Sequence, residues 1–200
     1  DSSTSRGLGD VYKRQIESLS HEGRGISHHD NKIIFTRGAL PGEKVIASRS
    51  LSRSKYEEAD MIEILEKSPD RIEAKCEVYG VCGGCSFQHL SSENQISVKE
   101  SWLKSAFMGQ AKSEPKKWLN PLQVNSWGYR RKARLGVRYV AKKEKVLVGF
   151  RERKSSFITV MSRCEVLHPS LGEKLELLGD CIGKLSIKTV SYTHLRAHET

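Results

Sequence analysis

The chain contains 200 residues, of which 37% are hydrophobic, and its formal net charge is +10. This length suits one ordinary domain or two small ones, each with a core of its own. The sequence has no run of about 18 apolar residues and no basic segment followed by an apolar one near its start, so we expect neither a membrane span nor a secretory signal. We therefore expect a cytoplasmic protein, in which the five cysteines are not paired as disulfides.

Almost all of the excess positive charge is gathered in one stretch, residues 129–154. There, eleven Lys or Arg residues face only two acidic residues, Glu144 and Glu152, which gives a net charge of +9. Basic charge clustered in this way is typical of a surface that binds nucleic acid. The alternative is a solvated basic hairpin that contributes only to solubility.

The two ends of the chain differ from its middle. Residues 1–15 are polar and rich in Gly and Ser, and residues 190–200 complete no recognisable element. Both ends resemble translated sequencing-adapter sequence, so we expect neither to belong to the natural protein. Two natural disordered tails are the alternative.

Residues 16–68 have the pattern of a small β-domain. Asp30-Asn31 precedes an apolar run, which indicates a hairpin turn, and Pro41-Gly42 marks a second turn. Residues 57–65 are predicted to be the last strand of this domain. Several short strands at this spacing predict a small closed β-barrel of the OB type.

Residues 69–189 are predicted to form a second, α+β domain, so that the chain as a whole is mostly β with some α. A helix is expected to begin at Ser92, with Gln95 as its capping-box partner. Apolar and cationic residues then alternate over residues 132–139, which indicates a strand with one apolar and one cationic face. A turn at residues 142–144 leads to a second strand with the same alternation.

Two further elements complete the predicted second domain. Residues 157–160 are largely apolar and predict a third strand. Ser170 and Glu173 form a second capping box, after which Leu and Ile recur at helical spacing as far as Leu185. Cys181 lies beside this apolar stripe and is expected to be a buried, inert thiol.

Three cysteines, Cys76, Cys82 and Cys85, have the spacing C-x5-C-x2-C, with two glycines inside the second gap. Thiolates at short loop spacing are the ligands of structural zinc and of iron–sulfur clusters. Three cysteines do not close a four-ligand site. We predict Cys164 as the fourth ligand, because it follows a predicted strand and precedes a turn, whereas Cys181 lies within a predicted helix. All-cysteine ligation is compatible with zinc and with iron, and the alternative to a metal is a set of unrelated buried cysteines.

Residues 76–90 (CEVYGVCGGCSFQHL) resemble the cluster loop of the bacterial RlmD (RumA) 23S rRNA uracil-5-methyltransferases. Residues 129–135 and 149–151, together with the later Cys164, resemble the same family. Residues 23–25 and 38–43 are similar to segments of that family's TRAM domain. The resemblance covers residues 16–185.

This resemblance implies a [4Fe–4S] cluster held by Cys76, Cys82, Cys85 and Cys164. It also implies an enzyme with an RNA-binding barrel, a cluster domain and a Rossmann-like domain that binds S-adenosylmethionine. In such enzymes a cysteine thiolate attacks C6 of a flipped-out uracil, so that C5 can accept the methyl group. No segment here resembles the family's cofactor loop or its catalytic-cysteine motif. We therefore expect the Rossmann-like domain to be absent, no catalytic or cofactor-binding residue in this chain, and the chain itself to be inactive.

The expected partner is 23S ribosomal RNA, with no membrane partner and a monomeric protein. Phosphate contacts fix the position of a protein on RNA without reading its sequence, and we predict them for Arg130, Arg131, Lys132 and Arg134. One alternative is an enzyme of the same superfamily that methylates tRNA or another rRNA site. Another is a non-catalytic zinc-ribbon module that binds RNA.

Overall fold

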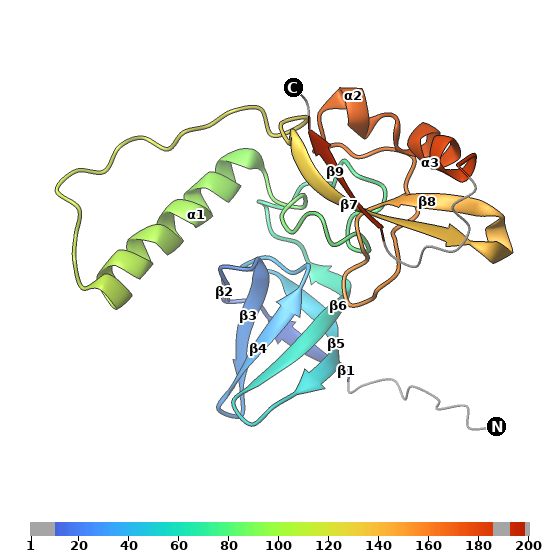
Figure 1. Ribbon diagram of the computed structural model, residues 1–200. Coiled ribbons are helices and arrows are strands. Elements are labelled where there is room, and N and C mark those ends of the chain that lie inside the picture. Colours follow the sequence, from blue (N-terminus) through green and yellow to red (C-terminus); the bar gives the residue numbers. More distant parts are fainter. Residues whose placement is uncertain (1–10, 186–192, 199–200) are drawn as a thin grey trace. The chain divides into compact units, whose positions relative to one another are not determined.

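The computed structural model describes residues 11–185 and 193–198 of the chain (Figure 1). The chain divides into two compact units, and we describe each by itself. The first unit comprises Asp1–Glu73 and His89–Pro121, and the second comprises Ala74–Gln88 and Leu122–Thr200. The second predicted domain was expected to run without a break from residue 69, whereas residues 89–121 are grouped with the first unit. No helix among the described residues is long and apolar enough to cross a membrane.

The first unit is built on a six-stranded sheet with the strand order β1-β5-β6-β4-β3-β2. Its edge strands, β1 and β2, are consecutive in the chain and separated only by Ile16 and Glu17, so the sheet curls until its two edges meet at one segment (Figure 1). The β4–β6 pair is parallel and the other pairs are antiparallel. The strands are β1 (Val11–Gln15), β2 (Ser18–Leu19), β3 (Arg24–His29), β4 (Lys32–Arg37), β5 (Lys44–Ser52) and β6 (Tyr56–Glu66).

The curled sheet confirms the predicted turn between β3 and β4. Asp30 and Asn31 have φ values of 47° and 60°, and Asp and Asn tolerate this left-handed conformation better than most residues. The sheet begins at Val11, within the stretch that was expected to be a non-native tail. The inward-facing side chains of the sheet form two buried clusters, which contain Ile16, Ala39 and Val45, and Ile34, Ala47 and Ala59.

A buried ion pair joins the loop before β5 to the chain that follows β6. Arg71 Nε lies 2.5 Å from Glu43 Oε1, and Arg71 Nη2 donates to Glu43 Oε2 at 2.8 Å and to the Gly38 carbonyl at 2.5 Å. The Glu43 side chain is fully buried and also accepts from the backbone amides of Leu40 and Ser68. The pair therefore closes one end of the sheet.

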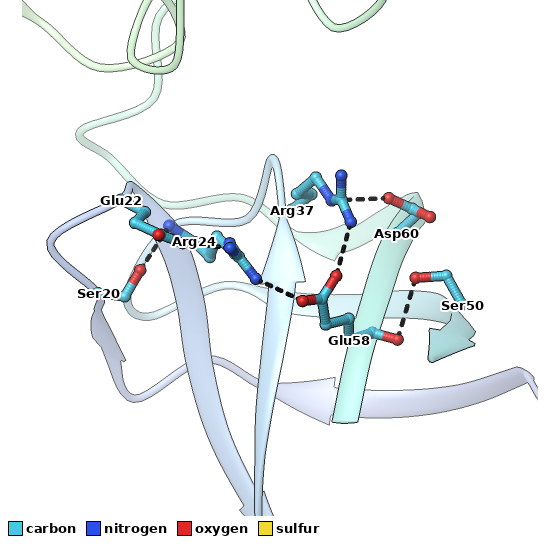
Figure 2. Close-up of polar contacts among 7 residues, drawn as sticks. All are labelled: Ser20, Glu22, Arg24, Arg37, Ser50, Glu58 and Asp60. Atoms are coloured by element: carbon cyan, nitrogen blue, oxygen red, sulfur yellow. Dashed lines mark hydrogen bonds and ion pairs between the residues drawn. The ribbon is translucent and has the colours of Figure 1, made fainter. Parts of the chain in front are cut away.

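The charged side chains on β3, β4 and β6 form a network of their own (Figure 2). Glu58 accepts from Arg24 and from Arg37, each at 3.0 Å, and Arg37 also contacts Asp60 at 3.2 Å. Residues 11–73 hold eleven Lys or Arg and eleven Asp or Glu, so this region carries no net charge. The excess positive charge lies elsewhere in the chain.

The helix of the first unit is α1 (Ser92–Ala106), which continues into a π-helical turn, η1 (Phe107–Ala111). The helix begins at Ser92, as predicted, and its N-cap is Ser91, whose side chain accepts from the Asn94 amide at 3.3 Å. The capping box predicted for Ser92 and Gln95 is therefore shifted by one residue. Gln95 does reach back, but its side chain donates to the Leu90 carbonyl at 2.8 Å.

The second unit contains a three-stranded sheet with the order β8-β7-β9. In β7, Ala133, Leu135 and Val137 are buried, whereas Lys132 and Arg134 are exposed, which confirms the predicted alternation. The buried residues pack with β8 and the following helices into one core. The elements are β7 (Lys132–Val140), η2 (Ala141–Lys143), β8 (Lys145–Gly149), α2 (Pro169–Gly172), α3 (Leu175–Gly183) and β9 (Thr193–His198).

The end of the second unit differs from the prediction in several respects. Residues 157–160 form no strand, only an isolated bridge between Arg151 and Ile158. The third strand is instead β9, which pairs with β7 and lies in the stretch expected to complete no element. The predicted single helix is two short ones, and the cap of the first is His168 rather than Ser170. Cys181 is exposed, not buried.

Candidate metal centre and basic strand

The four predicted ligands surround one cavity in the second unit. Cys76, Cys82, Cys85 and Cys164 all line it, and the cavity encloses about 300 Å³ of atom-free space, including its opening to solvent. Cys82 is buried and the other three are half-buried. Cys181, on α3, does not line the cavity. The remaining lining residues are Tyr79, Gly84, Gln88, Phe150, Met161 and Glu165.

The segment that carries Cys76, Cys82 and Cys85, which we call the cysteine loop, is a series of tight turns with little room for a side chain at Gly83 or Gly84. The Cys82 amide donates to the Val78 carbonyl at 2.9 Å. A Cβ at Gly84 would lie 3.2 Å from the Phe150 ring, and one at Gly83 would lie 2.9 Å from the Arg151 carbonyl oxygen. Glycine at both positions therefore lets the loop backbone approach the chain after β8 closely.

Each of the three loop sulfurs is close to an N–H group. The Gly84 amide donates to Cys82 Sγ at 3.4 Å. A backbone hydrogen bond from Val78 reaches Cys76, and a side-chain hydrogen bond from Gln88 reaches Cys85. Such N–H groups favour a thiolate over a thiol. They are the type of contact that adjusts the potential of an iron–sulfur cluster.

Burial and mutual repulsion act in the opposite direction on Cys76 and Cys85. Burial raises the pKa of the Cys76 thiol, and the neighbouring Cys164, Cys82 and Cys85 raise it further. Burial likewise raises the pKa of Cys85, although Gln88 and the positive charge of Arg130 oppose the increase. Four thiolates in one place therefore require a cation to be stable together.

Arg153 holds the cysteine loop from outside the cavity. Its Nε donates to the Cys82 carbonyl at 3.1 Å, and its Nη2 donates to the Cys85 carbonyl. The backbone amide of Arg153 donates to the Val81 carbonyl at 2.8 Å. In the sequence, Arg153 stands out only as one more positive charge in residues 129–154. No pattern in the sequence could identify it, because its partners are main-chain carbonyls of a distant loop.

The four predicted RNA contacts differ in their exposure and in their neighbours. Lys132 and Arg134 are exposed on the same face of β7, and Arg131 is exposed just before that strand. Arg130 is half-buried, and its guanidinium lies 5.1 Å from the centre of the Phe150 ring. Its positive charge opposes the increase that burial causes in the pKa of Cys85. Arg130 therefore belongs to the surroundings of the cysteine cavity.

The cavity offers donor atoms of one kind. Within residues 11–185 and 193–198, no group of three or more His, Cys, Asp or Glu side chains is placed so that it could hold a metal ion. The four cysteines line one cavity. The donor set nevertheless consists of four thiols with N–H groups directed at three of them, and soft donors of this kind suit iron–sulfur clusters.

Comparison with known proteins places the chain beside one group of enzymes. Residues 7–48 match the TRAM domain family. The 23S rRNA (uracil(1939)-C(5))-methyltransferase RlmD of Vesicomyosocius okutanii is 67% identical over 179 residues, which cover 90% of this chain and 41% of that protein. Over most of its length, this chain is similar in sequence to the RlmD methyltransferases. The RlmD of Nitrosococcus oceani is 49% identical over 175 residues, covering 87% of this chain and 39% of that protein.

The chain thus spans about two-fifths of the length of these RlmD relatives. A solved structure, that of the Pyrococcus abyssi tRNA (uracil-54, C5)-methyltransferase in complex with S-adenosyl-L-homocysteine, superposes with a TM-score of 0.62. It is 24% identical in sequence, and the match covers 88% of this chain and 37% of that one. At this identity the likeness establishes the fold alone. That fold is mostly β with some helices and includes a curled sheet.

Proposed function

We propose that this chain is the RNA-recognition and metal-binding part of an S-adenosylmethionine-dependent, cytoplasmic 23S rRNA uracil-5-methyltransferase, which forms 5-methyluridine. The observation that carries the proposal is the 67% identity over 179 residues to an RlmD enzyme. The curled sheet, in which β1 and β2 meet, supports an OB-type barrel in the region that matches the TRAM family. Such barrels commonly bind oligonucleotides.

We propose that the cysteine cavity holds a [4Fe–4S] cluster. The support is its lining of four cysteines and the resemblance of residues 76–90 to the cluster loop of the RlmD family. A four-iron cluster with one thiolate on each iron is held by four cysteine sulfurs. When bound, the cluster would cross-link the cysteine loop to Cys164 and would leave no iron position open. This chemistry suits a structural role or the positioning of RNA.

Replacing cysteines one at a time tests the ligand set. In anaerobically purified protein, we expect Cys164→Ser to remove most of the bound iron and sulfide, and the matched change Cys181→Ser to leave both unchanged. The two variants differ only in whether the cysteine lines the cavity. Iron retained by Cys164→Ser, or lost from Cys181→Ser, would contradict the assignment. Zinc without sulfide in the wild-type protein would favour the zinc-ribbon alternative.

The exposed cations at the start of β7 are proposed to contact RNA phosphates. Guanidinium and ammonium groups bind phosphate oxygens, and each contact adds about 0.7 to 0.9 to the slope of log affinity against log salt concentration. We expect the wild-type chain to bind RNA with a strong salt dependence and little sequence preference. The variant Arg131→Gln/Lys132→Gln/Arg134→Gln should lower that slope by about 2 to 3.

The salt slope is measured by titrating labelled RNA at several salt concentrations, with circular dichroism to verify the fold of each variant. An unchanged slope in the folded triple variant would remove these three residues from the RNA surface. No binding by the wild-type chain at low salt would contradict the RNA-recognition proposal itself.

A further inference from the structure

A second concave surface lies outside the cysteine cavity, in the same unit. It is an open depression of about 710 Å³, open solvent included, and we call it the loop-side cleft. One side comes from the cysteine loop and the other from β7 and the chain that follows β8. Its lining residues are Gly83, Arg134, Gly136, Phe150, Arg151 and Glu152.

The two sides of the loop-side cleft are joined by backbone hydrogen bonds. The Gly83 amide donates to the Arg151 carbonyl at 2.9 Å, and Cys82 and Glu152 form an antiparallel bridge. Arg153, which follows Glu152 in the chain, donates through its guanidinium to the Cys82 and Cys85 carbonyls. The position of Arg151 is therefore set by the loop that carries three of the cysteines.

The chemistry of the cleft suits an anion. Arg134 and Arg151 are both exposed, and a guanidinium can donate two parallel hydrogen bonds to a phosphate group. The one acidic residue in the lining, Glu152, already accepts from the Ser155 hydroxyl at 2.8 Å.

The open form of the depression suits one unit of an extended chain. The depression is open to solvent, so its occupant can be part of a longer chain. Proteins hold single-stranded RNA in positively charged grooves, whereas an RNA helix presents a broad minor groove and needs a wide contact area.

We propose that the loop-side cleft binds a phosphodiester unit of single-stranded RNA, with Arg134 and Arg151 on the phosphate and the cysteine loop as the opposite wall. The inference rests on the proposed function, because it takes RNA to be the partner, and it adds a specific site that includes Arg151. A further consequence is that the metal centre and RNA are coupled. A bound metal that fixes the cysteine loop would also fix the position of Arg151. Metal binding should therefore strengthen RNA binding, and RNA binding should strengthen metal binding to the same extent.

The test compares two double variants that remove the same charge. Arg134→Gln/Arg151→Gln alters the cleft, whereas Lys142→Gln/Lys143→Gln alters exposed cations at the η2 turn. The probe is a labelled single-stranded oligoribonucleotide of about 12 nucleotides, titrated by fluorescence anisotropy at several salt concentrations. We expect the cleft variant to lose on the order of tenfold or more in affinity and about 1.4 to 1.8 in salt slope. The turn variant should change much less.

The possible outcomes distinguish an error in the assignment of the cleft from an error in the proposed function. Equal losses in the two double variants would mean that only net charge matters, and would overturn the cleft assignment. No binding by the wild-type chain would instead overturn the proposal of an RNA partner. Tight binding of a duplex, with none of the single strand, would overturn the class of ligand.

The coupling has a test of its own, with RNA affinity as the readout. The metal-free chain should bind the oligoribonucleotide more weakly than the metal-loaded chain, and the Arg134→Gln/Arg151→Gln variant should show little of this difference. Equal affinities of the two wild-type forms, with folding verified by circular dichroism, would overturn the coupling while leaving the cleft assignment in place.

Discussion

At the scale of single residues, the buried pair of Glu43 and Arg71 is the interaction whose loss should cost most in the curled sheet. Burial alone would raise the pKa of Glu43, but the hydrogen bonds from Arg71, Leu40 and Ser68 outweigh it and lower that pKa below the ordinary value of 4.5. The carboxylate therefore stabilises the folded state fully above pH 4.5. This contribution is lost as the pH falls through the lowered pKa.

Glu43→Ala should lower the free energy of unfolding at pH 7 by about 3 to 5 kcal/mol, because it leaves the Arg71 guanidinium buried without its partner. Chemical denaturation measures the loss, which should shrink as the pH is taken below 4.5, where the wild-type carboxylate becomes protonated. The control is Glu66→Ala, whose partner Lys44 is exposed, and for which we expect a change of about 1 kcal/mol or less. A loss from Glu43→Ala as small as that of the control would contradict this account.

The residues of the metal centre were predictable to different degrees. The spacing of Cys76, Cys82 and Cys85 is a local pattern, and the choice of Cys164 over Cys181 followed from the elements expected around each. The roles of Gln88 and Arg153 were not predictable, because a hydrogen bond to a sulfur or a carbonyl depends on where distant segments meet. Arg130 was assigned to RNA for its charge, whereas its actual neighbours are Phe150 and Cys85.

At the scale of elements, regular alternation was a reliable guide where one face of a strand is buried. It identified β7 and β8. The curled sheet was instead predicted from turns and short apolar runs, and its first strand, β1, was missed. An apolar run alone misled for residues 157–160, which form no ladder and only an isolated bridge to Arg151. The Thr159 amide donates to the Phe150 carbonyl at 2.9 Å, and Ile158 is buried.

The break between α2 and α3 has a physical cause that helical periodicity cannot reveal. The Cys164 amide donates to the Gly172 carbonyl at 2.8 Å, so that carbonyl is taken by another segment. A Cβ at residue 172 would lie 2.6 Å from the Cys164 carbonyl oxygen, so only glycine fits. The apolar residues on both sides of the break still pack on β7 and β8. The hydrogen bond at the break therefore fixes the backbone of Cys164 to helices that pack in the core of the second unit.

At the scale of the whole molecule, charge is divided unequally along the chain. Residues 11–73 carry no net charge, whereas residues 129–154 carry +9. Several cations of the curled sheet are already engaged by carboxylates, as Figure 2 shows for Arg24 and Arg37. Under the proposed function, long-range attraction of RNA would therefore come mainly from the basic stretch. Any contribution of the curled sheet would depend on shape and on uncharged contacts.

The composition of the whole chain also leads to a prediction about its activity. Methyl transfer to C5 of uracil requires a nucleophile for C6 and a site for S-adenosylmethionine. In the described part of the chain, four of the cysteines surround one cavity, and the fifth, Cys181, is exposed on α3 and lines no cavity described above. The chain also spans only about two-fifths of its RlmD relatives.

We therefore expect the isolated chain to bind RNA without forming 5-methyluridine from unmodified 23S rRNA and S-adenosylmethionine. The measurement is nucleoside analysis after incubation. A full-length RlmD relative is the positive control. Turnover by the isolated chain that disappears in Cys181→Ser would show that Cys181 is the nucleophile and that a cofactor site exists in this chain.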